Sequence, residues 1–469
     1  MIKFRSHTKA RLFLVLFTIS ILLAACGGEG VDMGDKYVHG QDSQFFYSPV
    51  FEEGPYLATT EDGYYFVINA FVYFIDKETL KAVPLCNKPN CKHDSDECNA
   101  AFHTYDNFLS FYKGSLYVKG EASDKEERAL KNYIYQVSLD GSERKTVLEY
   151  KDGFQFGEPK TIHRGYIYFE NITPFIWESI NVGASISRYD LKDPSEREIL
   201  FESDLEDANV RLGSIYGNYL YFYELGYRGE ENISRSMIYN LETGEIKEMG
   251  NLGDDKIHPH FSTIFGGKLM YLGALYITDY DDYDVVEELG GKDAYLKAKN
   301  LTTIPLYEAD LWGENPKKVM DINIINSNSD IIADSDYVYE YSYNYYRFLE
   351  RRWLQEEGSE ADPNECLKNR YLKVMDKDFN EVAMVDIGSL NLPGNYLQIY
   401  LTQGEHIFLK AFDRGNVDDT DYADGLNDGD EVLYVIDKKD FGKEKVEVRE
   451  ILRRQIQDMG WSIDYNELP

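Results

Sequence analysis

Short runs of aromatic and β-branched residues recur along this chain, each bounded by glycine, asparagine or aspartate. Gly63-Tyr64-Tyr65-Phe66 is followed by Val72-Tyr73-Phe74-Ile75-Asp76, and a similar phrase returns at Gly114-Ser115-Leu116-Tyr117. Apolar runs of about four to eight residues between turn residues are typical of β-strands. The pattern therefore predicts a chain built mainly from strands.

These runs form units of nearly constant length. The turn that opens the second strand of each unit falls at positions 63, 114, 165, 217, 267, 336 and 404, at intervals of 51, 51, 52, 50, 69 and 68 residues. The two long intervals contain insertions, and a short strand precedes each turn, so each unit has about four strands. Four-stranded units at this spacing predict an all-β, seven-bladed β-propeller. A pair of stacked sandwiches is the alternative, but it would not require so regular a period.

The first residues have the three parts of an export signal. Four basic residues within the first eleven precede an apolar stretch at 12–23, and Leu23-Ala24-Ala25-Cys26 follows. An apolar stretch of this length is shorter than the roughly 20 residues that a transmembrane helix needs. The tetrad resembles the bacterial lipobox, which implies lipid on Cys26 after cleavage in front of it. The predicted organisation is a signal peptide at 1–25, a lipidated flexible linker at 26–40, a propeller at 41–452 and a C-terminal tail at 453–469.

The lipobox and the repeats together resemble the repeat-propeller surface lipoproteins of Gram-positive bacteria, most of which carry domains of unknown function. Asn240-Leu241-Glu242-Thr243-Gly244 resembles part of the quinoprotein-type, YWTD-like blade repeat. The tryptophan that docks those blades is missing, because the chain has only 4 tryptophans, and it has no Trp-Asp dipeptide of the WD40 kind. The resemblance implies a propeller at the extracytoplasmic face of the cell membrane and little about activity.

The amino-acid composition limits the classes of molecule that this protein is expected to bind. The formal net charge is -34, and such an acidic surface repels nucleic acid and anionic lipid head groups. The 39 tyrosines and 25 phenylalanines are too many for a chain that cannot build a core. The expected partners are therefore the membrane, through lipid on Cys26, and an extracellular ligand or protein, with no nucleic acid.

One segment concentrates soft metal ligands. Cys86, Cys91, His93 and Cys98 lie in the pattern C-x4-C-x-H-x4-C, and three thiolates with one imidazole form a common tetrahedral zinc set. The spacing resembles a zinc knuckle without matching it, so a role in nucleic-acid binding is not carried over. Four protein ligands leave zinc no open position, which makes the predicted site structural. Because exported cysteines often pair, disulfides that also involve Cys366 are the alternative, and unpaired thiols are a third.

Two weaker candidates involve other residue types. An acidic stretch between residues 416 and 431 resembles a calcium loop without the ligand spacing of an EF-hand; its candidate ligands are Asp419, Asp421, Asp424, Asp428, Asp430 and Glu431. His258 and His260 flank a proline at strand spacing and are candidates for side chains in the central channel. A solvated acidic loop and structural histidines are the plainer interpretations.

The functional prediction follows from these features. Loops after the second and fourth strands of a blade emerge on one face, and the unusual segments at 86–98, 279–300, 345–370 and 416–431 all fall in such loops. Function often depends on elaborated loops on a rigid scaffold, and no common catalytic motif occurs. We predict a non-enzymatic, cell-surface binding or scaffolding module. The alternative is a carbohydrate-active or peptide-cleaving enzyme with its site at the channel mouth.

Overall fold

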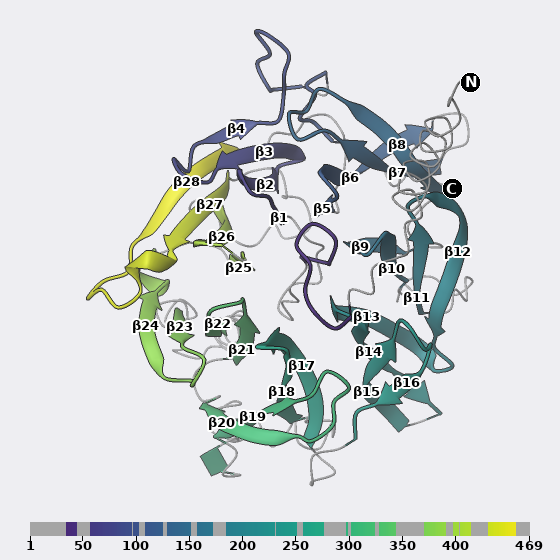
Figure 1. The fold of residues 1–469 in the computed structure, drawn as a ribbon, viewed down its shortest axis with the longest axis vertical. Helices are drawn as coiled ribbons and strands as arrows, with labels where there is room; N and C mark the ends of the chain where they lie inside the picture. Colours follow the sequence, from purple (N-terminus) through teal and green to yellow (C-terminus); the bar gives the residue numbers. More distant parts are fainter. Residues whose placement is uncertain are drawn as a thin grey trace, which may run out of the picture.

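The computed structural model describes residues 34–44, 57–95, 97–102, 108–124, 129–151, 157–171, 184–229, 231–250, 257–275, 297–298, 302–323, 328–343, 370–390, 397–402, 404–413 and 430–455. Within these residues the chain forms seven antiparallel sheets of four strands each, arranged in a ring (Figure 1). The predicted seven-bladed β-propeller is confirmed.

Each blade is a contiguous stretch of chain whose strands pair in sequence order. The first blade consists of β1 (Leu57–Thr59), β2 (Gly63–Ile68), β3 (Phe71–Asp76) and β4 (Ala82–Pro84), and the second of β5 (Leu109–Tyr112), β6 (Ser115–Asp124), β7 (Ala129–Val137) and β8 (Arg144–Lys151). The third consists of β9 (Glu158–His163), β10 (Tyr166–Asn171), β11 (Ser185–Asp190) and β12 (Asp193–Glu202). The fourth consists of β13 (Glu206–Tyr216), β14 (Tyr219–Arg228), β15 (Glu231–Asn240) and β16 (Ile246–Glu248). The fifth blade consists of β17 (Ile257–Phe265), β18 (Lys268–Leu275), β19 (Thr303–Ala309) and β20 (Lys317–Asn323). The sixth consists of β21 (Asn328–Ala333), β22 (Val338–Tyr343), β23 (Tyr371–Met375) and β24 (Glu381–Asp386), and the seventh of β25 (Leu397–Leu401), β26 (His406–Asp413), β27 (Asp430–Asp437) and β28 (Val448–Gln455). In the described part of the chain, short 3-10 helices lie at Gly388–Leu390 and Lys438–Asp440.

The second strands begin where the repeat predicts. β2, β6, β10, β14, β18, β22 and β26 each start at the predicted turn position or within two residues after it. Left-handed residues build several of these turns, including Lys113 at φ 45° and Gly114 at φ 79°. Glycine adopts this conformation without a Cβ clash, which explains why glycine marks most of the repeats.

The strand order defines two faces. The first strand of each blade lies innermost and the fourth outermost (Figure 1). Because successive strands are antiparallel, the connections after second and fourth strands emerge on one face, here called the insertion face. Connections after first and third strands emerge on the other, here called the plain face. The predicted insertions at 279–300, 345–370 and 416–431 each follow a second strand, and most of their residues lie outside the described part of the chain.

Tyrosine hydroxyl groups connect neighbouring blades. Tyr221 Oη on β14 donates to the carbonyl of Leu311, which lies in the next blade, over 2.8 Å. Tyr65 on β2 makes the equivalent bond to Leu139 over 2.9 Å. Large aromatic side chains on second strands are also among the most deeply buried groups of the described chain. Tyrosine therefore supplies both apolar area and a polar anchor at these seams, where quinoprotein-type blades use tryptophan.

Residues 34–44 cross the centre of the ring as a loop, drawn in purple in Figure 1. Their contacts are with first-to-second strand turns, which lie on the plain face: Gly40 accepts a hydrogen bond from Lys113 N over 2.8 Å, and Gln41 accepts one from Arg164 N over 2.7 Å. The segment therefore covers the middle of the plain face. None of the helices in the described residues is long and apolar enough to span a membrane. At the other end, β28 reaches Gln455, three residues into the predicted tail.

Candidate metal centre

The cysteine-rich loop is anchored at both ends to the start of β3. Leu85 N, just after β4, donates to Val72 O over 2.9 Å, and Val72 N donates to Ala100 O over 2.9 Å. Phe102 N adds a bond to Ala70 O over 2.8 Å. These bonds close a loop from 85 to 102 on the insertion face, between the first and second blades.

The loop brings the four predicted ligands together. The Sγ atoms of Cys86, Cys91 and Cys98 and a ring nitrogen of His93 all lie within 4.8 Å of one another, and His93 Nδ1 is 3.2 Å from Cys98 Sγ. Zinc–sulfur bonds of about 2.3 Å in a tetrahedron put neighbouring ligand atoms roughly 3.8 Å apart. The predicted Cys3His cluster is thus formed, and its geometry fits a tetrahedral ion. The three thiols are free in the structure.

The surroundings of the cluster shift the pKa values of Cys98 and Cys86 in opposite directions. Burial raises the pKa of Cys98 to about 12. Burial acts in the same direction on Cys86, but backbone N–H groups of Lys88 and Asn99 outweigh it and lower the pKa of Cys86 below its usual value. A bound cation would replace the protons, since thiolates are the ligands. Ala100 N also donates to Cys98 Sγ over 3.4 Å, a contact that favours the thiolate.

The weaker predicted sites are only partly described. Asp419, Asp421, Asp424 and Asp428 lie outside the described residues. Asp430 pairs with Arg453 Nη1 at 3.1 Å, and Glu431 pairs with Lys410 Nζ at 3.2 Å, so these two carboxylates contact protein cations. His258 and His260 lie on β17, the innermost strand of the fifth blade, and their place in the central channel stays a prediction. Cys26 and Cys366 lie outside the described residues.

Buried ion pairs between strands are a feature that the sequence analysis missed. Glu170 on β10 is 2% exposed and lies 3.1 Å from Lys160 Nζ and 3.2 Å from Arg211 Nη1. Glu224 on β14 pairs with Arg235 at 2.5 Å. A buried charge needs a partner of opposite sign. The available signal was a single charged residue directly after an aromatic run on a second strand.

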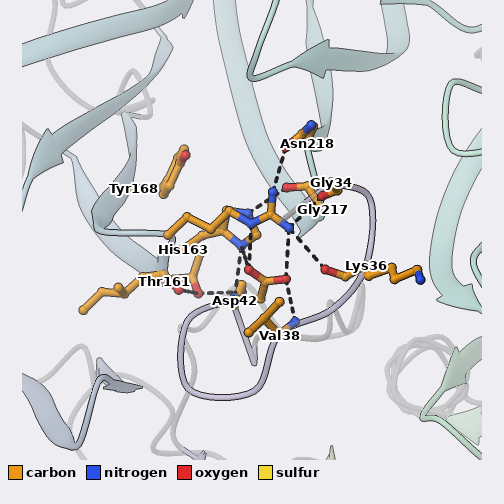
Figure 2. Close-up of polar contacts among 12 residues, drawn as sticks. Gly34, Lys36, Val38, Asp42, Thr161, His163, Tyr168, Gly217 and Asn218 are labelled. Atoms are coloured by element: carbon orange, nitrogen blue, oxygen red, sulfur yellow. Dashed lines mark hydrogen bonds and ion pairs between the residues drawn. The ribbon is translucent and has the colours of Figure 1, made fainter. Parts of the chain in front are cut away.

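The contact of the N-terminal segment with the plain face was also missed. Figure 2 shows Gly34, Lys36 and Asp42 of this segment close to His163 and Asn218. Arg164 makes the contacts: its Nε donates to Asp42 Oδ1 over 2.8 Å, and its Nη2 donates to the carbonyls of Gly34 over 2.8 Å and Lys36 over 3.2 Å. Nη1 donates to Asn218 Oδ1 over 2.7 Å, so one guanidinium connects the segment to the third and fourth blades. Asp42 is 2% exposed. Asp42 accepts a hydrogen bond from nearby Val38 N over 2.9 Å, but the cation that balances its charge is Arg164, 122 residues away.

Comparison with known proteins adds a likeness of fold. No protein-family model matches this chain, and no curated protein matches its sequence. A prolyl endopeptidase structure is similar at 12% identity with a TM-score of 0.46, over 84% of this chain and 49% of that one. Prolyl oligopeptidase B from Galerina marginata is similar at 10% identity and a TM-score of 0.46, over 84% and 50%. An oligogalacturonate lyase in complex with manganese has 14% identity and a TM-score of 0.41, over 73% and 79%.

These similar structures contain propellers. This chain spans about half the length of the two peptidases. At these identities the likeness concerns the fold alone, so the class that can be stated is a seven-bladed β-propeller with a Cys3His cluster.

Proposed function

We propose that this protein is a lipid-anchored, extracytoplasmic propeller that binds a ligand or partner protein on its insertion face. The supporting observation is the position of residues 34–44 on the plain face, where Arg164 binds Asp42 and the carbonyl of Gly34. Cys26 precedes Gly34 by eight residues, and eight extended residues span at most about 28 Å. A lipid on Cys26 would then keep the plain face toward the membrane. The insertion face, with its long connections, would face outward.

Binding is preferred over catalysis because of how the described interior carboxylates are used. Glu170, Glu224 and Glu431 each contact a lysine or arginine. A glycosidase instead needs two carboxylates about 5 to 9.5 Å apart that remain available to substrate. Among the described residues these interior carboxylates therefore support the ring, and the long connections provide the variable surface for recognition.

Photo-crosslinking from one blade tests which face binds. Tyr227, 41% exposed, lies near the end of β14 on the insertion face. Exposed Thr243 lies in the turn between β15 and β16 on the plain face of the same blade. A photo-reactive phenylalanine analogue at Tyr227 is expected to capture cell-surface partners on intact cells, and the same analogue at Thr243 is the matched control. Capture from position 243 alone would contradict the proposed orientation.

We also propose that the Cys3His cluster holds a structural zinc ion. The convergence of four ligand atoms within 4.8 Å supports it, and zinc with four protein ligands has no position for substrate. Near-stoichiometric zinc is expected by elemental analysis of protein purified with zinc and a reductant. Cys91→Ser should lose it, and Cys366→Ser, which changes the cysteine outside the cluster, should keep it. Metal-free protein with disulfide-linked peptides among Cys86, Cys91 and Cys98 would overturn the zinc proposal.

A further inference from the structure

The ring has one seam that the chain does not cross. Six seams join blades that are consecutive in sequence, but the seventh brings β1–β4 beside β25–β28. Both sheets are contiguous in sequence, so no strand is exchanged between the first and last blades in the described structure. Figure 1 shows β28, in yellow, next to β3 and β4. Closure at this seam therefore depends on side-chain contacts.

The inner part of the seam is aromatic and polar. Tyr64 Oη lies 2.9 Å from His406 Nδ1, and the ring of Tyr64 packs edge-on against Phe408 at 4.8 Å. Farther out, Asn69 N donates to the carboxylate of Glu431. These contacts involve β2, β26 and β27 and the turn between β2 and β3.

The outer part is different, because Arg454 on β28 binds the loop that carries the metal ligands. Its guanidinium lies 3.6 Å from the ring centre of Phe71, and it donates to Tyr73 Oη. Arg454 Nη2 also donates to the carbonyl of His93 over 3.0 Å. The acceptor therefore belongs to one of the four metal ligands.

His93 has a backbone that needs support. Its φ is 58°, a left-handed conformation that residues other than glycine adopt at a cost. Coordination of its imidazole would fix this conformation and so hold its carbonyl toward Arg454. Without the ion, only hydrogen bonds hold that carbonyl in place: those of the loop itself, among them Asn99 Nδ2 to Asn87 Oδ1 over 2.8 Å, and those from the arginines that contact the loop.

A second arginine holds the loop from the opposite side. Arg144 on β8, in the second blade, lies 3.9 Å from the ring centre of Phe102 and donates to the carbonyls of Asn99 over 2.7 Å and Ala101 over 2.9 Å. The loop thus contacts three blades: its own, the second through Arg144 and the seventh through Arg454. A rigid loop would join all three.

We infer that metal in the Cys3His site strengthens the closure of the propeller ring, because it fixes the loop whose His93 carbonyl adds to the contacts that Arg454 makes with β3 of the first blade. This inference rests on the proposed zinc site and adds a role for it. In this role the ion acts as a clasp: it does no chemistry, and its removal opens the seam locally while the individual blades stay folded.

Hydrogen exchange measured by mass spectrometry tests the clasp in the full-length protein. Zinc-loaded protein is compared with protein stripped by a chelator, both in reductant to prevent disulfides. Removal of zinc should speed exchange in β28 and residues 85–102 by about tenfold, the effect of losing one charged hydrogen bond. Peptides from β13 and β14, at the seam of the third and fourth blades, should not change.

Two variants on β28 separate the clasp from the metal site. Arg454→Gln should speed exchange in β28 with zinc still bound. Arg449→Gln is the matched control, because Arg449 is an exposed arginine on the same strand and its loss should leave the seam unchanged. Stoichiometric zinc whose removal leaves β28 exchange unaltered would overturn the clasp but keep the zinc site. Absence of zinc binding would overturn the zinc site itself. Wild-type exchange rates in β28 of the Arg454→Gln protein would refute the role of this arginine.

Discussion

His163 illustrates how single residues hold the N-terminal segment on the ring. It is fully buried, its Nε2 lies 2.8 Å from the carbonyl of Gly217, and its Nδ1 lies 3.1 Å from the backbone N of Ser43. The carbonyl can only accept and the backbone N–H can only donate, which assigns the proton to Nε2 and leaves Nδ1 as acceptor. A second proton, on Nδ1, would point at the Ser43 N–H and remove the acceptor of that hydrogen bond.

Stability should therefore fall in acid through His163. Burial lowers the pKa of His163 to about 4 against the opposing effect of Asp42, whereas an unfolded histidine has a pKa of about 6.5. The unfolded state binds the proton more readily between these values, so stability is lost as pH falls from about 6.5 to 4, by up to about 3 kcal/mol. Urea unfolding of wild type and His163→Gln across this range measures it. If the free energy of unfolding falls equally with pH in both proteins, protonation of His163 is not the cause of the loss of stability.

At the scale of elements, the same segment depends on Arg164. Its guanidinium reaches Asp42, the carbonyls of Gly34 and Lys36, and Asn218. Hydrogen bonds to charged groups are each worth about 1.5–3 kcal/mol, so this one side chain is a large part of what holds residues 34–44 on the plain face.

Arg164→Ala should release the segment without unfolding the ring. Trypsin cleavage after exposed Lys36 is expected to accelerate at least about tenfold, because local opening costs less free energy once these bonds are lost. Lys192→Ala, which removes an exposed cation from the same blade, serves as control. An unchanged cleavage rate in the Arg164 variant would mean that other contacts hold the segment.

Blade docking through tyrosine gives a second prediction at this scale. Tyr221→Phe removes the hydroxyl that bonds to Leu311 O and leaves a partly buried acceptor without its donor. The free energy of unfolding should decrease by about 1–2 kcal/mol. Urea denaturation measures this, with Tyr227→Phe on the same strand as control, since Tyr227 is 41% exposed. Equal losses in both variants would contradict a specific docking role for Tyr221.

For the whole molecule, the proposed anchor would determine where the ring is displayed. Cys26→Ala is expected to abolish incorporation of labelled fatty acid and to leave the precursor uncleaved by the lipoprotein peptidase, because the thiol of Cys26 is the proposed site of acylation. Cys366→Ala, the control, should remain lipidated. Radiolabel on the Cys26 variant would show that the resemblance of Leu23-Ala24-Ala25-Cys26 to a lipobox is misleading.

Most of the fold could be predicted from patterns of neighbouring residues in the sequence. Strand alternation and turn residues are short-range properties, so the repeat placed the second strand of every blade to within two residues. The Cys86–Cys98 spacing is equally local: all its ligands belong to one loop, and proximity in sequence already brought them near one another. The calcium candidates were harder, because Asp430 and Glu431 look like loop ligands but begin β27 and contact Arg453 and Lys410.

By itself the sequence determined the blade number, the start of each second strand and the members of the Cys3His cluster, since each depends on residues within about one blade of one another. Tertiary structure alone decided which distant groups meet. Asp42 finds Arg164 across 122 residues, and His93 finds Arg454 across 361. Such pairs have no periodic or spacing signal, because their partners become neighbours only when the ring closes. Closure and the covering of the plain face are therefore properties of the folded ring, and they give the metal loop and the N-terminal segment their proposed roles.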